Sequence, residues 1–463
     1  MEINPEVTFK HDRSLMYAKR PKVLIVGAGL GGLTLGAILQ KSDTPYEIFE
    51  RTSEIMPLGS ITNLTGVCAP LLKQLGIWDE FSSLSQMMAT MQIITAPEME
   101  TQFVIADVND PVKRYGAESR ALPRPTLYDL LLRQVPKERL HLGKKVLSTQ
   151  QGGNGVLIRC SDGTEYEGDI LVGSDGAYSA VRQNLYAQLK KENKLPATDS
   201  LPMPFLNVCL VGQTKKLTAE EFPDLTKSEV QFKNVLKSSK ENDAFKNSEW
   251  GLGAAMAMCA EVGHFPISSG GEKQLTLADL FAWTPKENIS KVMLEEKIFK
   301  TWYHTRTVLM GDSCHKVFFA RVKPLNPAGG SGAVNALHDA VVLANYIHAL
   351  PDHPIAEEIV AAFKAYKKER LPHVQAAFST SAAFRSMVDA GMKPTIMRYV
   401  MKNMPKWVNS AVEKRILSNR PQIYFLPRDT TPTEMAPAYQ PSLSLKRPEA
   451  KQKPVVVEGV QPL

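Results

Sequence analysis

The sequence lacks the features that mark secreted, membrane-spanning and zinc-binding proteins. Its five cysteines form no C-x-x-C pair, which argues against a disulfide framework or a structural zinc site. No apolar run approaches the roughly 20 residues that span a bilayer, and residues 1–20 are too polar for a signal peptide. These absences predict a cytoplasmic, unsecreted protein that holds no metal.

A strong charge bias is also absent. The 463 residues carry a formal net charge of +7, which is mild for this length. Such a charge favours anionic ligands without indicating nucleic acid, and we find no nucleic-acid-binding motif. Because domains typically have ~100–200 residues, the length predicts two or three domains or one elaborated domain.

What is present begins with a nucleotide-binding βαβ pattern at residues 23–50. An apolar strand, Val23 to Val26, leads into Gly27, Gly29 and Gly32, which fill the G-x-G-x-x-G spacing and open a helix whose N-terminus favours a pyrophosphate. A second strand, Tyr46 to Phe49, leads to Glu50, close to the spacing of roughly 20 residues expected of a ribose-binding carboxylate. A bare glycine motif also occurs in ordinary turns, but strand, helix and acid together favour dinucleotide binding.

Two further apolar strands end in short polar motifs. The run GDILVGSDG places Asp175 and Gly176 between a buried strand and a helix, although Asp-Gly alone is more often a plain turn. A third strand ends at Gly311 and Asp312, and a segment rich in proline and glycine then leads to a long apolar helix from Ala333. We interpret His315 as a structural partner and assign no catalytic residue.

The rest of the chain predicts a β-rich region followed by helices. Strands are expected at 91–108, 205–211 and 250–259, with a mobile loop at 227–248, and helices at 355–370 and 372–387. The basic amphipathic segment 395–417 can lie weakly on a membrane surface, although such a pattern is more often a packed helix with one solvated face. The composition of residues 426–463 predicts a disordered tail.

The motifs GAGLGG, GDILVGSDG and VLMGDSCH, in this order, resemble those of the flavin-dependent aromatic-hydroxylase family, the class A flavin monooxygenases, and most closely its fungal members. The resemblance covers roughly residues 20–350. It implies an α/β fold, with a Rossmann-like FAD-binding domain of the glutathione-reductase type and an inserted β-rich substrate domain. The expected divisions are 20–60, 118–195 and 300–352 for FAD, 61–117 and 196–299 for substrate, 353–425 for C-terminal helices, and 426–463 for the tail.

The resemblance also implies cofactor contacts. The FAD pyrophosphate would lie on Gly27, Gly29 and Gly32, and the helix that starts near Gly332 and Ala333 would point its N-terminus at the flavin. The remaining contacts would be Glu50 with the adenosine ribose, Gly59 on the loop beyond, Arg124 with the flavin, Asp175 and Gly176 with FAD and NADPH together, and Asp312 with the ribityl chain.

The sequence departs from the family pattern in two places. Ser174 stands where Ala or Cys is usual, a change of little consequence. Residues 317–325, VFFARVKPL, lengthen a connection that related fungal sequences make almost directly. We interpret this excursion as a surface segment that covers the flavin-side cleft or the neighbouring substrate domain.

The activity implied by the resemblance is that of an FAD-dependent monooxygenase. NADPH or NADH would reduce non-covalent FAD, O₂ would give a flavin hydroperoxide, and an apolar or aromatic metabolite would be hydroxylated or epoxidised. The alternatives are a flavin oxidoreductase without oxygen transfer, a flavin halogenase, and a non-catalytic flavin-binding module recruited to a membrane through its C-terminal helices. The dispersed tryptophans form no halogenase motif.

Overall fold

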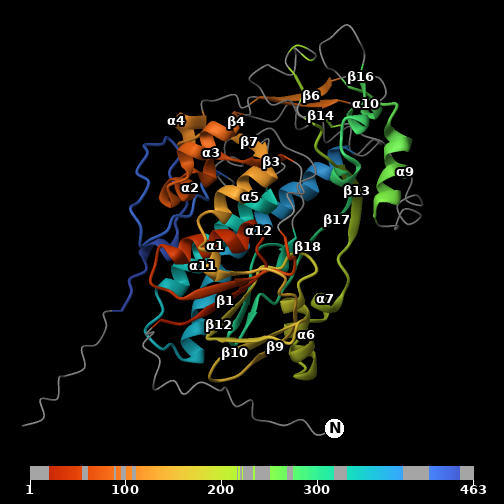
Figure 1. The fold of residues 1–463 in the computed structure, drawn as a ribbon. Coiled ribbons are helices and arrows are strands. Elements are labelled where there is room, and N and C mark those ends of the chain that lie inside the picture. Colours follow the sequence, from red (N-terminus) through yellow and green to blue (C-terminus); the bar gives the residue numbers. More distant parts are fainter. Residues whose placement is uncertain are drawn as a thin grey trace, which may run out of the picture.

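A mostly parallel sheet with layers packed on both faces forms the centre of the molecule (Figure 1). The computed structural model describes residues 20–54, 61–87, 90–94, 101–106, 111–215, 217–218, 220, 222, 233–234, 251–267, 275–316, 331–388 and 417–448. The predicted Gly59, the loop at 227–248 apart from 233–234, the excursion at 317–325 and the segment 395–416 lie outside these residues. None of the described helices combines the length and the apolarity that crossing a bilayer requires.

The six-stranded sheet aligns the three predicted motifs at one edge. Its order is β19 (Tyr303–His304), β20 (Thr307–Leu309), β12 (Ile170–Gly173), β1 (Val23–Val26), β2 (Tyr46–Phe49) and β8 (Leu140–His141), and only the β19–β20 pair is antiparallel. In this register Val26 pairs with Gly173, and Gly173 pairs with Leu309. The carboxyl ends of β1, β12 and β20 therefore lie side by side.

Strands β1, β12 and β20 are almost entirely apolar and fully buried because both faces of the sheet are covered. Figure 1 shows helices on one face, and a small three-stranded sheet with α6 on the other. The first layer contains α1 (Leu30–Gln40), α5 (Arg124–Leu132), α11 (Ser331–His348) and α12 (Ala356–Val388). The second contains α6 (Ala180–Lys191), β9 (Val146–Gln151), β10 (Val156–Cys160) and β11 (Glu165–Gly168). The predicted α/β class is confirmed.

Residues 61–87 and 111–123 add helices and a short sheet beside α5. They form β3 (Ile61–Leu64), η2 (Gly66–Cys68), α2 (Ala69–Leu75), α3 (Trp78–Leu84), β4 (Gln86–Met87), α4 (Pro111–Tyr115) and β7 (Arg120–Pro123), with sheet order β3-β7-β4. The buried side chains of Leu71, Leu72 and Phe81 belong to the same core as β1. The division into domains stays a prediction, but this packing ties α2 and α3 to the nucleotide-binding unit.

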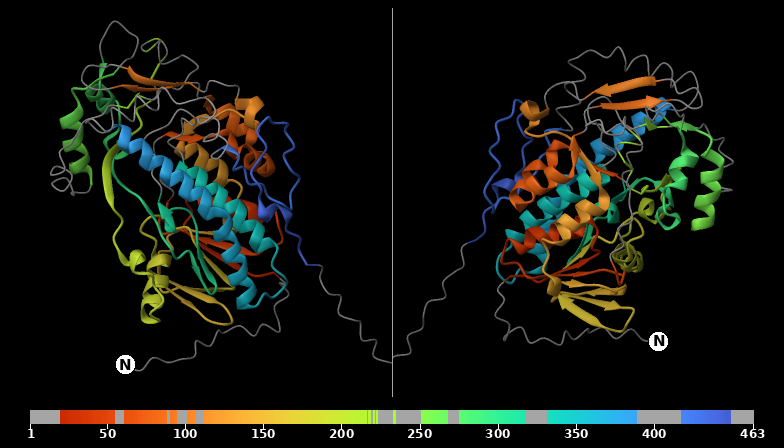
Figure 2. Two further views of the ribbon diagram at one scale, coloured as in Figure 1. Left: turned by 180° about the vertical axis from the view of Figure 1, so that it is seen from behind. Right: turned by 45° about the horizontal axis from the view of Figure 1, so that its top comes forward.

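A second group of elements lies beyond the far end of the helical layer (Figure 2). It contains β5 (Thr90–Ile94), β6 (Thr101–Ala106), β13 (Phe205–Val211), β14 (Lys233–Asn234), α9 (Leu252–Val262), β15 (Pro266–Ile267), β16 (Leu275–Thr276), α10 (Leu277–Ala282) and β17 (Ser290–Glu295). β13 pairs with β17, β5 lies between β6 and β14, and β15 pairs with β16. The short elements η3 (Lys137–Arg139), α7 (Ala197–Ser200), η5 (Lys286–Asn288), β18 (Lys297–Ile298) and β21 (His315–Lys316) complete the connections.

Two predicted elements are wrong. The strand expected at 250–259 is helix α9, because its alanines and methionines are strong helix formers and Gly251 adopts a φ of +94° before the first turn. The two helices expected at 355–370 and 372–387 are one helix, α12, which contains Pro372 in its interior.

The described part of the predicted disordered tail, residues 426–448, is folded. It ends near a short helix, η7 (Pro441–Ser444), in which Ser442 is fully buried. Asp429 pairs with Lys73 at 3.1 Å, and Arg447 pairs with Asp43 and Asp352 at 3.0 Å each. Polar side chains distant in sequence supply this attachment, so the composition of the segment alone indicated disorder wrongly.

Candidate cofactor site

The glycine loop after β1 packs against the Asp-Gly turn after β12. Gly27 adopts a φ of +103°, and a Cβ on it would lie 2.5 Å from the carbonyl oxygen of Ser174. A Cβ on Gly32 would lie 2.0 Å from the carbonyl oxygen of Gly27. Both positions require glycine, because a side chain at either one would overlap the neighbouring backbone.

Gly29 differs from these two glycines because it faces open space. A Cβ built on it meets no described atom within 4 Å. It is the N-cap of α1, whose first turn has no acidic side chain. The first N–H groups of a helix have no acceptor within the helix, and they favour an anion together with the helix dipole. The N-terminus of α1 therefore has both space for an anionic ligand and backbone N–H donors that can bind it.

Glu50 supports the same loop from the end of β2. Its Oε2 accepts a hydrogen bond from the backbone N–H of Ala28 at 2.9 Å. Its Oε1 accepts from the N–H and the hydroxyl of Thr52, both at 3.1 Å. An ionised carboxylate offers about four acceptor positions, so these three bonds leave about one for a ligand hydroxyl.

Gly31 marks the point where all the predicted motifs meet, and the sequence analysis did not single it out. A Cβ on Gly31 would lie 3.2 Å from Cε of Met310, 3.3 Å from Cβ of Ala336 and 3.5 Å from Oγ of Ser174. These three residues belong to the third motif, helix α11 and the second motif. One small residue thus allows segments more than 300 positions apart to converge at the start of α1.

Asp175 faces the protein at the start of α6. Its Oδ2 accepts from the backbone N–H of Ala180 at 2.6 Å and of Val181 at 3.2 Å, and its Oδ1 accepts from the hydroxyls of Ser179 and Ser313. Burial raises the pKa of this carboxyl group despite these bonds. All of its acceptor positions are therefore engaged, and any contribution of Asp175 to FAD or NADPH stays a prediction.

The Gly-Asp turn after β20 is the short helix η6 (Gly311–Ser313). Ser313 connects it to the Asp-Gly turn, since its Oγ accepts from the backbone N–H of Gly176 at 3.0 Å. The Arg182 guanidinium donates to the carbonyl oxygen of Ser313 at 2.9 Å. Gly176 itself has a φ of +81°, which suits glycine at this position.

Asp312 is the acidic side chain of this turn whose carboxylate stays available to a ligand. No hydrogen-bond partner for its carboxylate is found among the described residues, and its side chain is half-buried. Burial raises its pKa, while the neighbouring His315, Lys316 and Arg124 oppose that shift. Arg124 is exposed at the first position of α5. The fold therefore brings two predicted cofactor contacts, Arg124 and Asp312, into one electrostatic environment.

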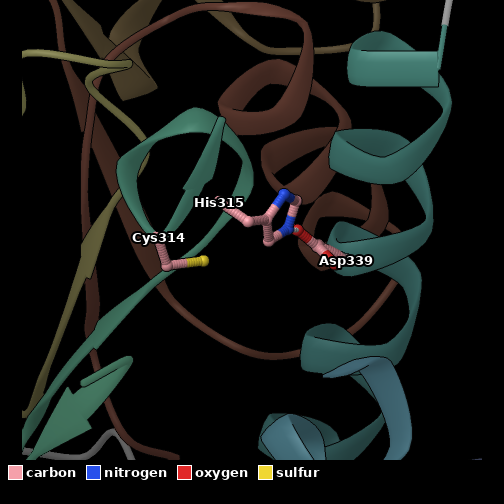
Figure 3. Close-up of side chains that lie close together, drawn as sticks. All are labelled: Cys314, His315 and Asp339. Atoms are coloured by element: carbon pink, nitrogen blue, oxygen red, sulfur yellow. Dashed lines mark hydrogen bonds and ion pairs between the residues drawn. The ribbon is translucent and has the colours of Figure 1, made fainter. Parts of the chain in front are cut away.

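Asp339 of α11 lies beneath the same turn, and Figure 3 shows it pointing at His315. Its Oδ2 accepts from Nε2 of His315 at 2.6 Å and from the N–H of Gly311 at 2.9 Å. Its Oδ1 accepts from Nε of Arg370 at 2.7 Å. Burial alone would raise its pKa, but the neighbouring His315 and Arg370 bring it down to about 2. His315 is thus a structural partner, as predicted.

Comparison with known proteins agrees with these motifs. The profile of a family described as "FAD binding domain" matches residues 20–224. The FAD-dependent monooxygenase prhF of Penicillium brasilianum is 28% identical over 356 residues, covering 71% of this chain and 70% of the relative. The FAD-dependent monooxygenase atmM of Aspergillus flavus is 25% identical over 434 residues, covering 88% and 87%. The chain is a homologue of FAD-dependent monooxygenases.

Solved structures show that this monooxygenase homologue has a flavoprotein fold. HpxO of Klebsiella pneumoniae, solved with FAD and uric acid, is similar with a TM-score of 0.62 at 17% identity, covering 86% of this chain and 96% of that chain. 2,6-Dihydroxypyridine-3-hydroxylase of Arthrobacter nicotinovorans gives 0.57 at 15% identity, covering 79% and 91%. The expected resemblance and fold class are thereby confirmed.

The residues of this monooxygenase homologue fit FAD. The end of α1 offers room at Gly29 and backbone donors for a pyrophosphate, Glu50 retains acceptor capacity, and Asp312 carries a carboxylate with no described hydrogen-bond partner. Gly332 and Ala333 lie in the first turn of α11 and are partly exposed. The individual contacts of all these residues with FAD stay predictions.

Cys314, His315 and Asp339 place possible metal-ligating atoms within 4.8 Å of one another (Figure 3). The chemistry of the three groups does not suit a metal. Nε2 of His315 and Oδ2 of Asp339 are already in hydrogen-bond contact with each other. Burial raises the pKa of the Cys314 thiol well above its usual range, so the thiolate that binds metals is disfavoured. The cluster is a hydrogen-bonded support for the turn.

Proposed function

We propose that this protein is an FAD-dependent monooxygenase that uses NADPH or NADH and O₂ to hydroxylate or epoxidise an apolar or aromatic small molecule. The observation that carries the proposal is the convergence of the glycine loop, the Asp-Gly turn, the Gly-Asp turn and α11 around Gly31. A dehydrogenase built on the glycine loop alone has no need of the other two turns. The names of the homologues support the same assignment.

In this proposal the protein binds, orients and shields, and FAD, held without a covalent bond, supplies the redox and oxygen chemistry when it is present. The N–H groups at the start of α1 hold the pyrophosphate beside Gly29, and Glu50 accepts a hydrogen bond from the adenosine ribose. Asp312 accepts from the ribityl hydroxyls, with the charge of Arg124 nearby. The first turn of α11, at Gly332 and Ala333, directs its N–H groups and positive dipole end toward the flavin ring.

The cytoplasmic location and a weak membrane contact through residues 395–417 belong to the same proposal. The positive net charge and the basic amphipathic pattern of that segment support the contact. Flotation of the full chain with vesicles that contain anionic lipid tests it. Equal recovery with neutral and anionic vesicles would exclude an electrostatic membrane contact.

Gly29→Ala tests the cofactor site with little disturbance of the protein itself. The added Cβ meets no described protein atom, and the φ of −71° suits alanine, so the folded protein should keep its thermal midpoint. The same Cβ would occupy the space assigned to the pyrophosphate, so the affinity for FAD should fall at least tenfold. Gly153→Ala is the matched control, because its Cβ also meets nothing within 4 Å but lies in the β9–β10 turn. Equal FAD affinity of both variants and wild type would move the pyrophosphate away from Gly29.

Substrate-dependent turnover tests the reaction class. The FAD-saturated protein is supplied with NADPH or NADH and a panel of apolar and aromatic metabolites under ¹⁸O₂. A monooxygenase consumes the donor faster with its substrate and adds one ¹⁸O atom to the product. Donor consumption with substrate oxidation but no ¹⁸O incorporation would instead identify an oxidoreductase without oxygen transfer. Bound flavin that no donor reduces would identify a non-catalytic flavin-binding module.

A further inference from the structure

We propose that Asp339 is a positioning residue for the flavin site, which holds the turn around Asp312 through Gly311 and His315 and is itself held by Arg370. This inference rests on the proposed function, because Asp312 is there the acceptor for the ribityl chain. Asp339 touches neither substrate nor cofactor in this scheme. It acts on the cofactor through the geometry of the turn.

One carboxylate oxygen fixes both ends of the segment that carries Asp312. Oδ2 of Asp339 is 2.9 Å from the backbone nitrogen of Gly311 and 2.6 Å from Nε2 of His315. Asp312 lies between these two anchors in sequence. Gly311 has a φ of +56°, so the chain turns sharply there, and the hydrogen bond to its N–H holds that turn. Loss of the carboxylate oxygen would release both ends together.

The opposite side of the turn is fixed independently. Ser313 accepts from the N–H of Gly176 and from Arg182 through its hydroxyl and carbonyl oxygens. The turn is therefore held by the Asp-Gly turn on one side and by α11 on the other. Asp312 is left as the side chain of this turn that makes no hydrogen bond with a described residue. This is the arrangement expected of a ligand-binding carboxylate on a rigid support.

Arg370 joins α12 to this support. Its Nε donates to Oδ1 of Asp339 at 2.7 Å, and its Nη2 donates to Oδ1 of Asn335, one turn earlier on α11, at 3.0 Å. The side chains of Asp339 and Arg370 are both fully buried. Apolar residues could pack α11 on α12 without the cost of burying two charges. We therefore infer that the role of the buried Asp339–Arg370 pair is to orient the carboxylate of Asp339 toward Gly311 and His315.

Asp339→Asn tests the proposal because it preserves the shape of the side chain. An amide cannot accept from Gly311, His315 and Arg370 together, since one of its oxygens is replaced by a donor. We expect the full-length protein to fold and to bind FAD about tenfold more weakly. The midpoint potential of the bound flavin should also shift. Glu369→Gln is the matched control: it lies next to Arg370 on α12, and its carboxylate bonds to Tyr346 and Ser442 instead of the turn. This control should keep the FAD affinity within twofold of wild type and the midpoint potential of the flavin within experimental error.

A double-mutant cycle separates positioning from general stability. If Asp339 acts through Asp312, then Asp339→Asn should change FAD affinity less than threefold when Asp312→Ala is already present. A tenfold loss in both backgrounds, or in neither, would overturn the proposal. If Asp339→Asn does not fold, His315→Leu replaces it in the cycle, because it keeps the Asp339–Arg370 pair and removes the hydrogen-bond donor of one anchor. Wild-type protein that binds no FAD would refute the proposed function itself, and wild-type binding with an additive cycle would refute the positioning role alone.

Discussion

The buried His338 of α11 should make the free energy of unfolding depend on pH. It is 2% exposed, its Nε2 is 3.8 Å from Sγ of Cys68, and its Nδ1 is 3.3 Å from Nδ2 of Asn419. Burial, followed by the positive charge of Arg370, lowers its pKa from 6.5 to about 3. The folded protein therefore keeps this imidazole neutral where an unfolded chain would protonate it.

The sign and size of the effect follow from this difference. Between pH 6.5 and about 3 the unfolded chain binds a proton at His338 that the folded protein does not, so the free energy of unfolding falls as the pH falls through this window. With these two pKa values, one such histidine lowers the free energy of unfolding by about 2 kcal/mol between pH 7 and pH 5. At pH 7 this destabilisation by His338 is almost completely absent.

His338→Gln removes the titrating group while keeping a polar side chain. Urea unfolding of FAD-saturated wild type and variant at pH 7 and pH 5 gives the change in unfolding free energy for each. We expect the variant to lose about 2 kcal/mol less than the wild type on acidification. The difference between the two decreases in unfolding free energy excludes the contributions of the other titrating groups and the cost of the substitution at pH 7. Equal losses would refute the buried, neutral state of His338.

Three further outcomes are expected. Acid precipitation should release all flavin into the supernatant, and a yellow pellet would contradict non-covalent binding. Glu50→Ala and Asp312→Ala should each weaken FAD binding by ~1.5–3 kcal/mol, measured by flavin fluorescence titration, because each removes a carboxylate that can accept from ligand hydroxyls. Asp175→Ala should lower the free energy of unfolding by ~0.5–2 kcal/mol through the lost capping of α6, and by resemblance it should also slow flavin reduction in FAD-saturated enzyme. Unchanged reduction kinetics would leave Asp175 with the structural role alone.

The central sheet could be predicted from the sequence because its signals are local. Strands β1, β2, β12 and β20 are short, mostly apolar runs that lead to a glycine or a carboxylate, and β1 and β2 begin and end at the predicted residues. A strand buried on both faces shows such a continuous run without needing its partners to be known. The predicted N-terminal region of α11 was also found, since a long apolar helix is visible without tertiary information.

Features that depend on long-range contacts could not be predicted in this way. The folded segment 426–448 is attached through partners such as Lys73 and Asp43, which lie hundreds of residues earlier. Helix α9 sits where its apolar run was too short to separate strand from helix by periodicity. Asp339 and Arg370 had one usable signal, a charged residue on an otherwise apolar helix face, but nothing in the sequence joined the two.

The structure also divides the motif residues into two groups that the sequence presents as equivalent. The motif residues Asp175 and His315, together with Asp339 of α11, make hydrogen bonds within the protein, so they support the turns. Gly29 faces open space, Glu50 keeps one acceptor position, and Asp312 has no described hydrogen-bond partner. A ligand hydroxyl or phosphate needs an acceptor, a donor or room that the protein has not already used. Direct contacts with the cofactor should therefore come from the second group, while substitutions in the first should act through the position of the turns.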